Sequence, residues 1–586
     1  MFSSTYGSTR TAVAAGNVVA LVGNLQTIVR RVAGFLTARR LVAGLCVVGV
    51  LLRFLVLCLF PDFITEDSDS YILASEFLRT QDTTLRIAFG HRQLGYPAVI
   101  LAFRSFVPHP FFALSATQIL LSVASCYLVY RICLRLGVGI AGSIVALAYC
   151  VLNRQSIVYS IVVAPETGLA FLLVLSTFVF LVHLDLLVYP GGSQAKSLSM
   201  FVVQALILCA LMITKTLFNL FAVLVLMGYA TALLAAWRRG GTRVGMQVGG
   251  FLLFLTLGGS LCGAALALER RLLETRKFYP FCAAWALSTS QYYMDLAGAL
   301  HRDFKNAVRP MVLEGRRNLE SLEYQLDGYR KGNVTNLEYD KLMSAYVRDR
   351  WHSTDDYDYY CDVEVFSREL LMEGLPRQVG HYTRWYLLPE VVRALFVSQP
   401  RDLGSFRFYT VRSFREFPQF YQEDRDSRLY HFVNHNPWAR ATVPWALGLL
   451  LNRVTFACQQ AFSVAFIAYC LLFPFVRSLR PRSFVGWFGT CFLVIHAAAY
   501  VVVTGGLVWS HERYFMYTSF AIVVIGARML SWLVGAAEDS APKAGRALAK
   551  QARAGLIMLS VLVAVEIANQ ASALVSPGPI VMRLLF

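Results

Sequence analysis

Long apolar runs separated by short polar segments dominate the pattern of the chain. About eleven of these runs approach the ~20 residues that a helix needs to cross a bilayer. In the long non-membrane segment 269–440, the alternation of apolar and polar residues that is typical of a β-strand does not extend for any length. The pattern therefore predicts an all-α polytopic membrane protein. The expected spans lie at about 41–60, 112–131, 138–157, 166–186, 198–214, 216–236, 245–267, 447–475, 484–505, 514–534 and 555–575.

The segments between these spans carry an asymmetric charge. Arg30, Arg31, Arg39 and Arg40 stand just before the first span, and the positive-inside rule then makes residues 1–40 a cytosolic tail. Counting onward, the connections expected in the cytosol read "RICLRLG", "WRRGGTR", "RSLRPR" and "PKAGRALAKQAR". Each of them is basic, so the positive-inside rule is consistent with a chain that crosses the membrane in alternating directions at all of these spans.

Composition supports the same class of protein. The chain of 586 residues is 56% hydrophobic and 15% charged, whereas an average soluble domain has roughly 25% charged residues. Cytosolic connections that face anionic lipid explain the net charge of +18. A nucleic-acid-binding function would need a basic soluble domain, and the pattern shows none. Membrane lipids are the expected neighbours, and nucleic acid is not an expected partner.

Two segments are expected to project to the non-cytosolic side. The first, 61–111, follows the first span, and the second, 269–440, separates a transmembrane core at 41–268 from C-terminal spans within 441–586. Patterns such as "LESLEYQLDGYRKG" predict a mainly helical extracytoplasmic domain in the second segment. This domain also contains Cys282 and Cys361. In an oxidising compartment this pair either forms a disulfide or remains as two free thiols, and the sequence leaves both alternatives open.

Ionisable residues near the span ends gather on the expected outer side. An ionisable group at membrane depth needs a partner or water, so it is a functional hypothesis by default. Because these residues come from distant parts of the sequence and share one face, they predict a common cavity. They are Asp67 and Asp69 after the first span, His91 and Arg92 in "GHRQLGYP", Glu166 in "VVAPETGLAF", Lys215 in "MITKTLFN", and His511, Glu512 and Arg513 in "WSHERYFMY".

Each of these residues also has a purely structural explanation. Asp67 and Asp69 in "TEDSDSY" suit a helix N-terminus, where short polar and acidic side chains satisfy free N–H groups. Glu166 stands at another expected helix start, and the side chains of Lys215 and Arg513 could extend to lipid head groups. The joint occurrence of acids and bases on one side favours a functional site.

One set of motifs resembles a known family. Asp67-Ser68-x-x-Tyr71, followed by Arg92-x-x-Gly95-Tyr96-Pro97, resembles the first outer loop of the GT-C glycosyltransferases. These polyprenyl-phosphate-sugar-dependent membrane enzymes include the aminoarabinose lipid A transferases and the protein O-mannosyltransferases. Pro165-Glu166, Thr214-Lys215 and Glu512-Arg513-Tyr514 are similar to later landmarks of the family. The resemblance covers most of 41–240 and, more weakly, 440–535, and departs from the family at Leu94 and Thr216, where proline is usual. It implies a GT-C-like helix bundle beneath an extracytoplasmic cap.

The resemblance also implies an activity: inverting transfer of a sugar from a polyprenyl-phosphate donor to an acceptor hydroxyl on the non-cytosolic face. Asp67 occupies the position of the family's catalytic aspartate, where a carboxylate can take the hydroxyl proton during attack. Lys215 and Arg513, then Arg92 and His91, are candidates for stabilising the leaving phosphate. Support of the substrates is expected from Asp69, Tyr71, Tyr96, Glu166, His511, Glu512 and Tyr514. The sugar stays open, as does the acceptor, which is a lipid, a polysaccharide or a protein. The expected location is a bacterial inner membrane, with the site facing the periplasm.

Alternatives remain for the cofactor and for the class of function. Asp67-Ser68-Asp69 has the Asp-x-Asp spacing associated with Mg²⁺ or Mn²⁺ in some glycosyltransferases. The motif is short, so the first expectation is that no cofactor is needed. An O-antigen-type polymerase or ligase using a polyprenyl-diphosphate glycan would also need outer cations, but not the acid after the first span. A membrane transporter would show interrupted helices, polar residues at mid-membrane and repeated halves, and the sequence shows no repeat.

Overall fold

The computed structural model describes most of the membrane-embedded part of the chain. The described residues are 38–59, 66–188, 194–215, 218–238, 244–274, 442–481, 483–505 and 511–538, with the short pieces 348–350, 352, 362 and 365–366. Every regular element among them is a helix. Most of the predicted extracytoplasmic domain at 269–440, including Cys282 and Cys361, lies outside these residues, as does the predicted cytosolic tail up to Ala38.

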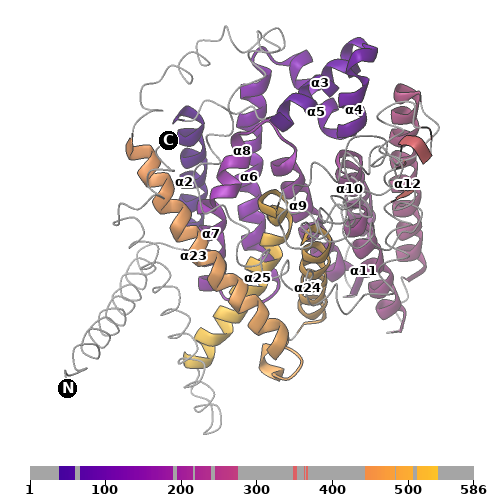
Figure 1. Ribbon diagram of the computed structural model, residues 1–586. Helices are drawn as coiled ribbons and strands as arrows, with labels where there is room; N and C mark the ends of the chain where they lie inside the picture. Colours follow the sequence, from indigo (N-terminus) through magenta and orange to yellow (C-terminus); the bar gives the residue numbers. More distant parts are fainter. Residues whose placement is uncertain are drawn as a thin grey trace, which may run out of the picture.

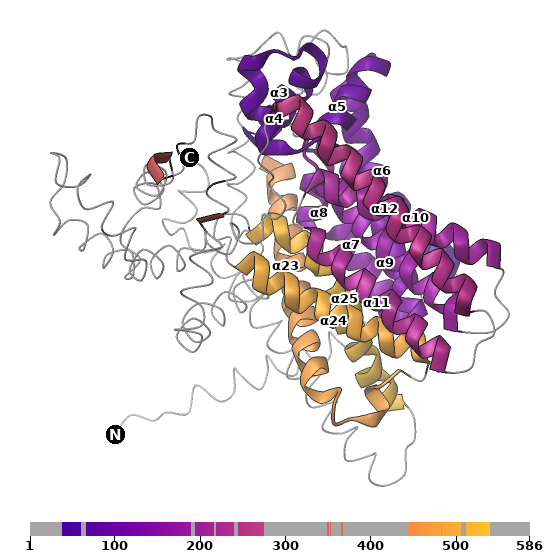
Figure 2. The ribbon, with the colours of Figure 1, turned by 90° about the vertical axis from the view of Figure 1, so that its right-hand side faces the viewer.

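The helices form one bundle with a group of short helices at one end (Figures 1 and 2). The short group consists of α3 (Glu66–Thr80), η1 (Thr83–Leu85), α4 (Arg86–Arg92) and α5 (Gly95–Phe106). The long helices of the first half are α2 (Ala38–Leu59), α6 (Pro110–Arg135), α7 (Ile140–Leu152), α8 (Arg154–Ile161), α9 (Glu166–Val188), α10 (Gln194–Thr214), α11 (Asn219–Arg238) and α12 (Val244–Leu273). The second half adds α23 (Thr442–Leu472), η7 (Arg477–Leu479), α24 (Phe484–Gly505) and α25 (His511–Glu538).

Seven helices in the described part of the chain are long and apolar enough to cross a membrane, or eight if the bent pair α7–α8 is one span. They indicate an integral membrane protein. Each predicted span up to about residue 534 coincides with one helix, except 138–157, which corresponds to the bent pair. α23 and α24 contain only the shorter apolar stretches Cys458–Leu472 and Phe484–Tyr500. The predicted span 555–575 lies outside the described residues, so the count of eleven stays a prediction.

The third predicted span differs from the expectation of one continuous helix at 138–157. It is a pair of helices, α7 and α8, bent by 47°. Asn153 causes the interruption, because its side-chain oxygen accepts a hydrogen bond from the Ser156 amide at 3.0 Å and so caps a new helix. Asparagine offers the backbone this local alternative to a continuous helix. An apolar run alone does not reveal such a break.

Aromatic residues form the centre of the bundle and join its two halves. The ring of Phe180 on α9 lies 4.9 Å from that of Tyr229 on α11 and 5.0 Å from that of Phe492 on α24. At the end opposite α3–α5, Arg528 of α25 donates to the Tyr469 hydroxyl on α23 at 3.2 Å and also to the carbonyl of Leu136 after α6. The helices before and after the long central segment therefore share one core.

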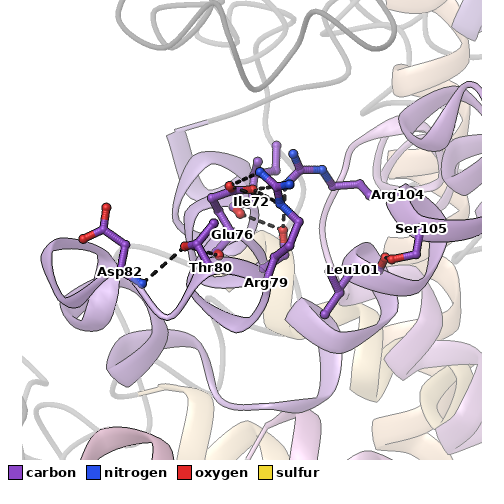
Figure 3. Close-up of polar contacts among 9 residues, drawn as sticks. Ile72, Glu76, Arg79, Thr80, Asp82, Leu101, Arg104 and Ser105 are labelled. Carbon is purple, nitrogen blue, oxygen red and sulfur yellow. Dashed lines mark hydrogen bonds and ion pairs between the residues drawn. The ribbon is translucent and has the colours of Figure 1, made fainter.

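The short helices are fixed to the bundle and to one another. Leu273 at the end of α12 packs with Phe77 of α3 and Phe89 of α4. Figure 3 shows the carboxylate of Glu76 on α3 facing the guanidinium groups of Arg79 and Arg104. Arg104 Nη1 on α5 lies 2.8 Å from Glu76 Oε2. The side chains of Glu76 and Arg104 are each only 5% exposed, so this buried ion pair fixes α3 against α5.

Candidate functional site

The group of short helices marks the end of the bundle at which the predicted site residues gather. α3 begins at Glu66, which places positions 67 and 69 in its first turn. α9 begins at Glu166, α10 ends one residue before Lys215, and α25 begins at His511. The contacts described below join these helix ends, so the juxtaposition of distant segments that the sequence predicted is present for the side chains that the structure describes.

Lys215 and Glu166 form the charged centre of this region. Lys215 Nζ lies 3.7 Å from Glu166 Oε1. The Glu166 side chain is inaccessible, whereas that of Lys215 is 18% exposed. Because an ionised carboxylate is costly to bury without a cation nearby, the pair fixes the start of α9 beside the end of α10. The lysine is the member of the pair that solvent or a ligand can reach.

Aromatic rings from the second half of the chain complete the surroundings of Lys215. Its Nζ lies 5.8 Å from the centre of the Tyr517 ring on α25, within the distance at which a ring face attracts a cation. Phe218, just after α10, packs edge-on against Tyr517 at 5.0 Å. Position 513 lies one helical turn before Tyr517, so it shares that face of α25 and lies nearer its start.

A close backbone contact fixes α5 against the end of α10. A Cβ atom added to Gly95 would lie 2.8 Å from Thr214 Cα and 2.9 Å from Thr214 N. Real Cβ atoms do not approach backbone this closely, so glycine is the residue that fits. The contact places Tyr96 and Lys215, the residues next along the chain, on adjoining elements.

Arg92 at the end of α4 is held by α3. Its Nε donates to Ser70 Oγ at 2.6 Å, and its guanidinium carbon lies 4.6 Å from the centre of the Tyr71 ring. Tyr71 in turn packs edge-to-face with Tyr96, with ring centres 5.1 Å apart. The motifs Asp67-Ser68-x-x-Tyr71 and Arg92-x-x-Gly95-Tyr96-Pro97 are thus one packed unit.

Gln118 of α6 connects this unit to Glu166. Its Nε2 donates to the Tyr96 hydroxyl at 3.1 Å and to the carbonyl of Ala164 at 2.7 Å. Burial raises the pKa of Tyr96 well above its usual value, the negative charge of Glu166 and the neighbouring Tyr71 raise it further, and the hydrogen bond from Gln118 opposes them. Tyr96 therefore stays protonated and neutral at any pH at which the protein works. We refer to Tyr71, Arg92, Tyr96, Glu166, Lys215 and Tyr517 as the Lys215 site.

Several predicted site residues have helix positions but no described side chains. They are Asp67 and Asp69 in α3, His91 in α4, and His511, Glu512, Arg513 and Tyr514 in the first turn of α25. The separations of Asp67 from Lys215 and from Arg513 consequently stay predictions.

A metal site at Asp67 and Asp69 also stays a prediction. Residues two apart on a helix lie about 200° apart around its axis, so positions 67 and 69 do not share one face of α3. Within the described part of the chain, no group of three or more His, Cys, Asp or Glu residues is arranged to hold a metal ion.

Sequence reasoning missed three contributors to this region: Gln118, Phe218 and Tyr517. Gln118 left a signal, because polar residues recur at positions 115, 118 and 122 on one face of the mostly apolar α6. The two aromatic residues left none, since similar residues occur throughout the spans.

Comparison with known proteins adds no relative: no protein-family model, no curated protein and no solved structure matches the chain. The family resemblance therefore rests on the motifs quoted from the sequence.

Proposed function

We propose that the chain is an integral-membrane inverting glycosyltransferase that moves a sugar from a polyprenyl-phosphate donor to an acceptor hydroxyl on the extracytoplasmic face. The observation that carries this proposal is the Lys215–Glu166 pair beside Tyr517. It joins three of the resembling motif regions, from α9, α10 and α25, at the same end of the bundle as α3 and its aspartates.

The leaving phosphate needs fixed positive charge more than it needs a proton. Lys215 supplies a partly exposed ammonium group. Arg513, whose position shares a face of α25 with Tyr517, adds a guanidinium group that can form a bidentate contact with phosphate oxygens. Arg92 and His91 at the end of α4 are next in order. One pre-positioned donor of this kind contributes about 3 kcal/mol to transition-state stabilisation.

The acceptor hydroxyl needs a base. Asp67 in the first turn of α3 takes that proton as the hydroxyl attacks the anomeric carbon, and the sugar–phosphate bond breaks on the opposite side. The neutral Tyr96 and the ring of Tyr71 are buried and pack against each other beside α3, so in this proposal they support the site from within the protein. Asp69, His511, Glu512 and Tyr514 support the substrates in the same proposal.

The orientation follows from charge. The connection from α23 to α24, which contains Arg477 and Arg480, lies at the end of the bundle opposite α3–α5 (Figure 1). Positive residues favour the cytosolic side, so the Lys215 site faces the periplasm or the exterior, in a bacterial inner membrane. A cysteine label at position 480 should react only from the cytosol, and labelling from outside would reverse the orientation.

The experiment that tests the activity is Asp67→Asn in full-length protein reconstituted with a polyprenyl-phosphate sugar. Transfer should fall at least ~100-fold, as expected for loss of a general base, while binding of a short-chain prenyl phosphate is unchanged. Asp82→Asn is the matched control, because Asp82 is an exposed aspartate that caps η1 in the same segment. Near-normal transfer by Asp67→Asn would remove the assignment of the base.

One observation favours a membrane transporter as the second candidate. The break between α7 and α8, with the charged Arg53 buried beside it, is an interrupted helix of the kind that transporters use. Uptake of a phosphorylated lipid or sugar into proteoliposomes, without any transfer product, would favour this candidate over the transferase.

A further inference from the structure

The interrupted span α7–α8 needs help from outside its own backbone. The last carbonyls of α7 have no partner within that helix, and inside a membrane each unsatisfied backbone group is costly. Asn153 satisfies one amide on the α8 side, since its oxygen accepts from the Ser156 N–H at 3.0 Å. The carbonyl of Val151 on the α7 side requires a donor from another helix.

Arg53 of α2 supplies that donor. Its Nη1 lies 3.0 Å from the Val151 carbonyl oxygen, its Nη2 2.9 Å from Ser156 Oγ on α8, and its Nε 3.0 Å from Ser122 Oγ on α6. A further bond from Nη1 returns to the Gly49 carbonyl at 3.1 Å. One guanidinium group thus contacts both sides of the break and the helix behind it.

The position of this charge is unusual for a side chain whose only role is to reach the lipid surface. Arg53 is 0% exposed and lies six residues, about 9 Å, before the end of α2. A lysine or arginine that merely extends to the head groups keeps its charge in water. Arg53 instead directs its donors at two hydroxyls and two carbonyls.

Glycine allows the approach of α2 to the break. A Cβ atom added to Gly49 would lie 3.2 Å from Val151 Cγ1 and 3.5 Å from Arg53 Nη1. The tight contact is the one with the Val151 side chain, so Gly49 allows α2 to pack closely against the end of α7.

The segment that follows the break leads to the Lys215 site. It is held by the face of α6 that also carries Ser122, the partner of Arg53. Ser115 Oγ donates to the Ile161 carbonyl at 3.0 Å, and Gln118 Nε2 to the Ala164 carbonyl at 2.7 Å. α8 and the turn after it are thus held at their start by Arg53 and at their end by α6, immediately before Glu166.

We propose that Arg53 is a positioning residue: it holds α8 at its angle and thereby sets Glu166 opposite Lys215. Only the choice of ligand in the test below rests on the proposed function. The geometric part concerns the break itself and does not depend on which reaction the protein performs.

The test compares Arg53→Met, Arg53→Lys and the control Arg131→Met in full-length protein in nanodiscs. Arg131 is exposed on α6 and donates to Tyr127 at 3.0 Å, so its replacement also removes an arginine from a spanning helix. The readout is the rate of hydrogen exchange at the backbone amides of residues 154–166, measured by mass spectrometry. The amides in the rest of α9 serve as the internal reference. In Arg53→Met the amides of 154–166 should exchange at least ~10-fold faster while α9 is unchanged, since local opening reports lost local interactions. Arg53→Lys should recover part of the protection, and Arg131→Met should match the natural protein.

A second readout is the affinity for farnesyl phosphate. It should fall ~10-fold or more in Arg53→Met and stay unchanged in Arg131→Met, because misplacing Glu166 misplaces Lys215. Unchanged exchange at 154–166 in folded Arg53→Met would overturn the proposal, as would faster exchange with unchanged affinity. If the natural protein binds no farnesyl phosphate while the exchange result stands, the proposed function fails and the structural role of Arg53 holds.

If Arg53→Met does not fold, the double variant Ser122→Ala/Ser156→Ala replaces it. This variant removes two acceptors and retains the guanidinium group. It should show the same local increase in exchange, and protection equal to the natural protein would contradict the proposal.

Discussion

Lys215 Nζ lies 3.7 Å from Glu166 Oε1, and the carboxylate of that pair is inaccessible whereas the lysine is partly exposed. The pair joins the start of α9 to the end of α10. It gives Lys215 a fixed position, and fixed cations stabilise anionic ligands better than mobile ones do because little reorganisation is needed on binding.

Replacing Lys215 with alanine should weaken binding of a short-chain prenyl phosphate by ~10-fold or more, because a charge-assisted hydrogen bond contributes about 1.5–3 kcal/mol. Lys215→Arg should retain part of the affinity. The measurement is isothermal titration calorimetry in detergent. Lys196→Ala is the control, since Lys196 is exposed near the opposite end of the same helix. Equal affinities for Lys215→Ala and Lys196→Ala would move the phosphate site elsewhere.

Glu166 and Lys215 should behave as a coupled pair in a double-mutant cycle. Lys215→Met should lower the free energy of unfolding by about 3 kcal/mol, because it removes the cation beside the inaccessible Glu166 carboxylate. Glu166→Gln should lower it by less, because the lysine that remains is partly exposed. The double variant should lose less than the sum, with a coupling energy of about 1–3 kcal/mol. Chemical denaturation in mixed micelles gives the four values. Additive losses would show that the two groups do not depend on each other.

Gly95→Ala should destabilise the contact between α5 and α10 by about 1–3 kcal/mol, as forced overpacking does. The new methyl group would meet the Thr214 backbone, which cannot rotate away as a side chain could. Gly168→Ala is the matched control: it lies in α9, and a Cβ atom there meets nothing within 4 Å. That substitution should be neutral or stabilise the helix by up to about 1 kcal/mol. Thermal unfolding measures both, and a neutral Gly95→Ala would contradict the close approach.

Glu76 should make the packing of α3 against α5 depend on pH. Burial alone would raise the pKa of its carboxyl group, but the hydrogen bonds and charges of Arg79 and Arg104 together outweigh burial and lower the pKa below its usual value. A lowered folded-state pKa stabilises the protein above the unfolded-state value, and that stability is lost as the pH falls through the folded-state pKa.

The measurement for Glu76 is thermal unfolding between pH 7 and pH 3 in the natural protein, in Glu76→Gln and in Glu274→Gln. Glu76→Gln should lose stability at neutral pH and show a weaker loss on acidification. Glu274, which is mostly exposed and pairs with Arg86 at 3.6 Å, is the control. Exposed ion pairs contribute about 0–1 kcal/mol, so Glu274→Gln should follow the natural protein. Parallel pH curves for all three proteins would exclude this role of Glu76.

The sequence allowed the long helices to be located, because a run of apolar residues long enough to cross a membrane is a strong signal on its own. It did not predict the break at Asn153, since one polar residue hardly changes the average over a span. Arg53 was missed for a related reason: the sequence around it is that of an ordinary span, and its partners Ser122 and Val151 are distant in the chain. Side-chain partners of this kind follow from the packing of helices, and apolar periodicity does not specify which faces meet.

For the candidate site, the sequence likewise predicted which region each residue occupies but not its detailed contacts. The expectation that Glu166 and Lys215 share one region matches their contact, because both lie at span ends that an alternating topology places on one side. Their distance and the aromatic ring of Tyr517 depend on how α25 packs against the first half of the chain. Topology assigns a side of the membrane and leaves the neighbours of each helix undetermined.

The hydrogen bonds that Arg53 donates to oxygen atoms end on two serine hydroxyls and two backbone carbonyls. Serine hydroxyls and backbone carbonyls do not titrate, and a guanidinium group already carries its proton, so acidification does not change any of these groups. Acidification of the compartment outside the membrane should therefore leave the angle of α8 unchanged while it loosens the junction of α3 and α5. The protein would lose the anchoring of its surface helices before the arrangement within the bilayer changes.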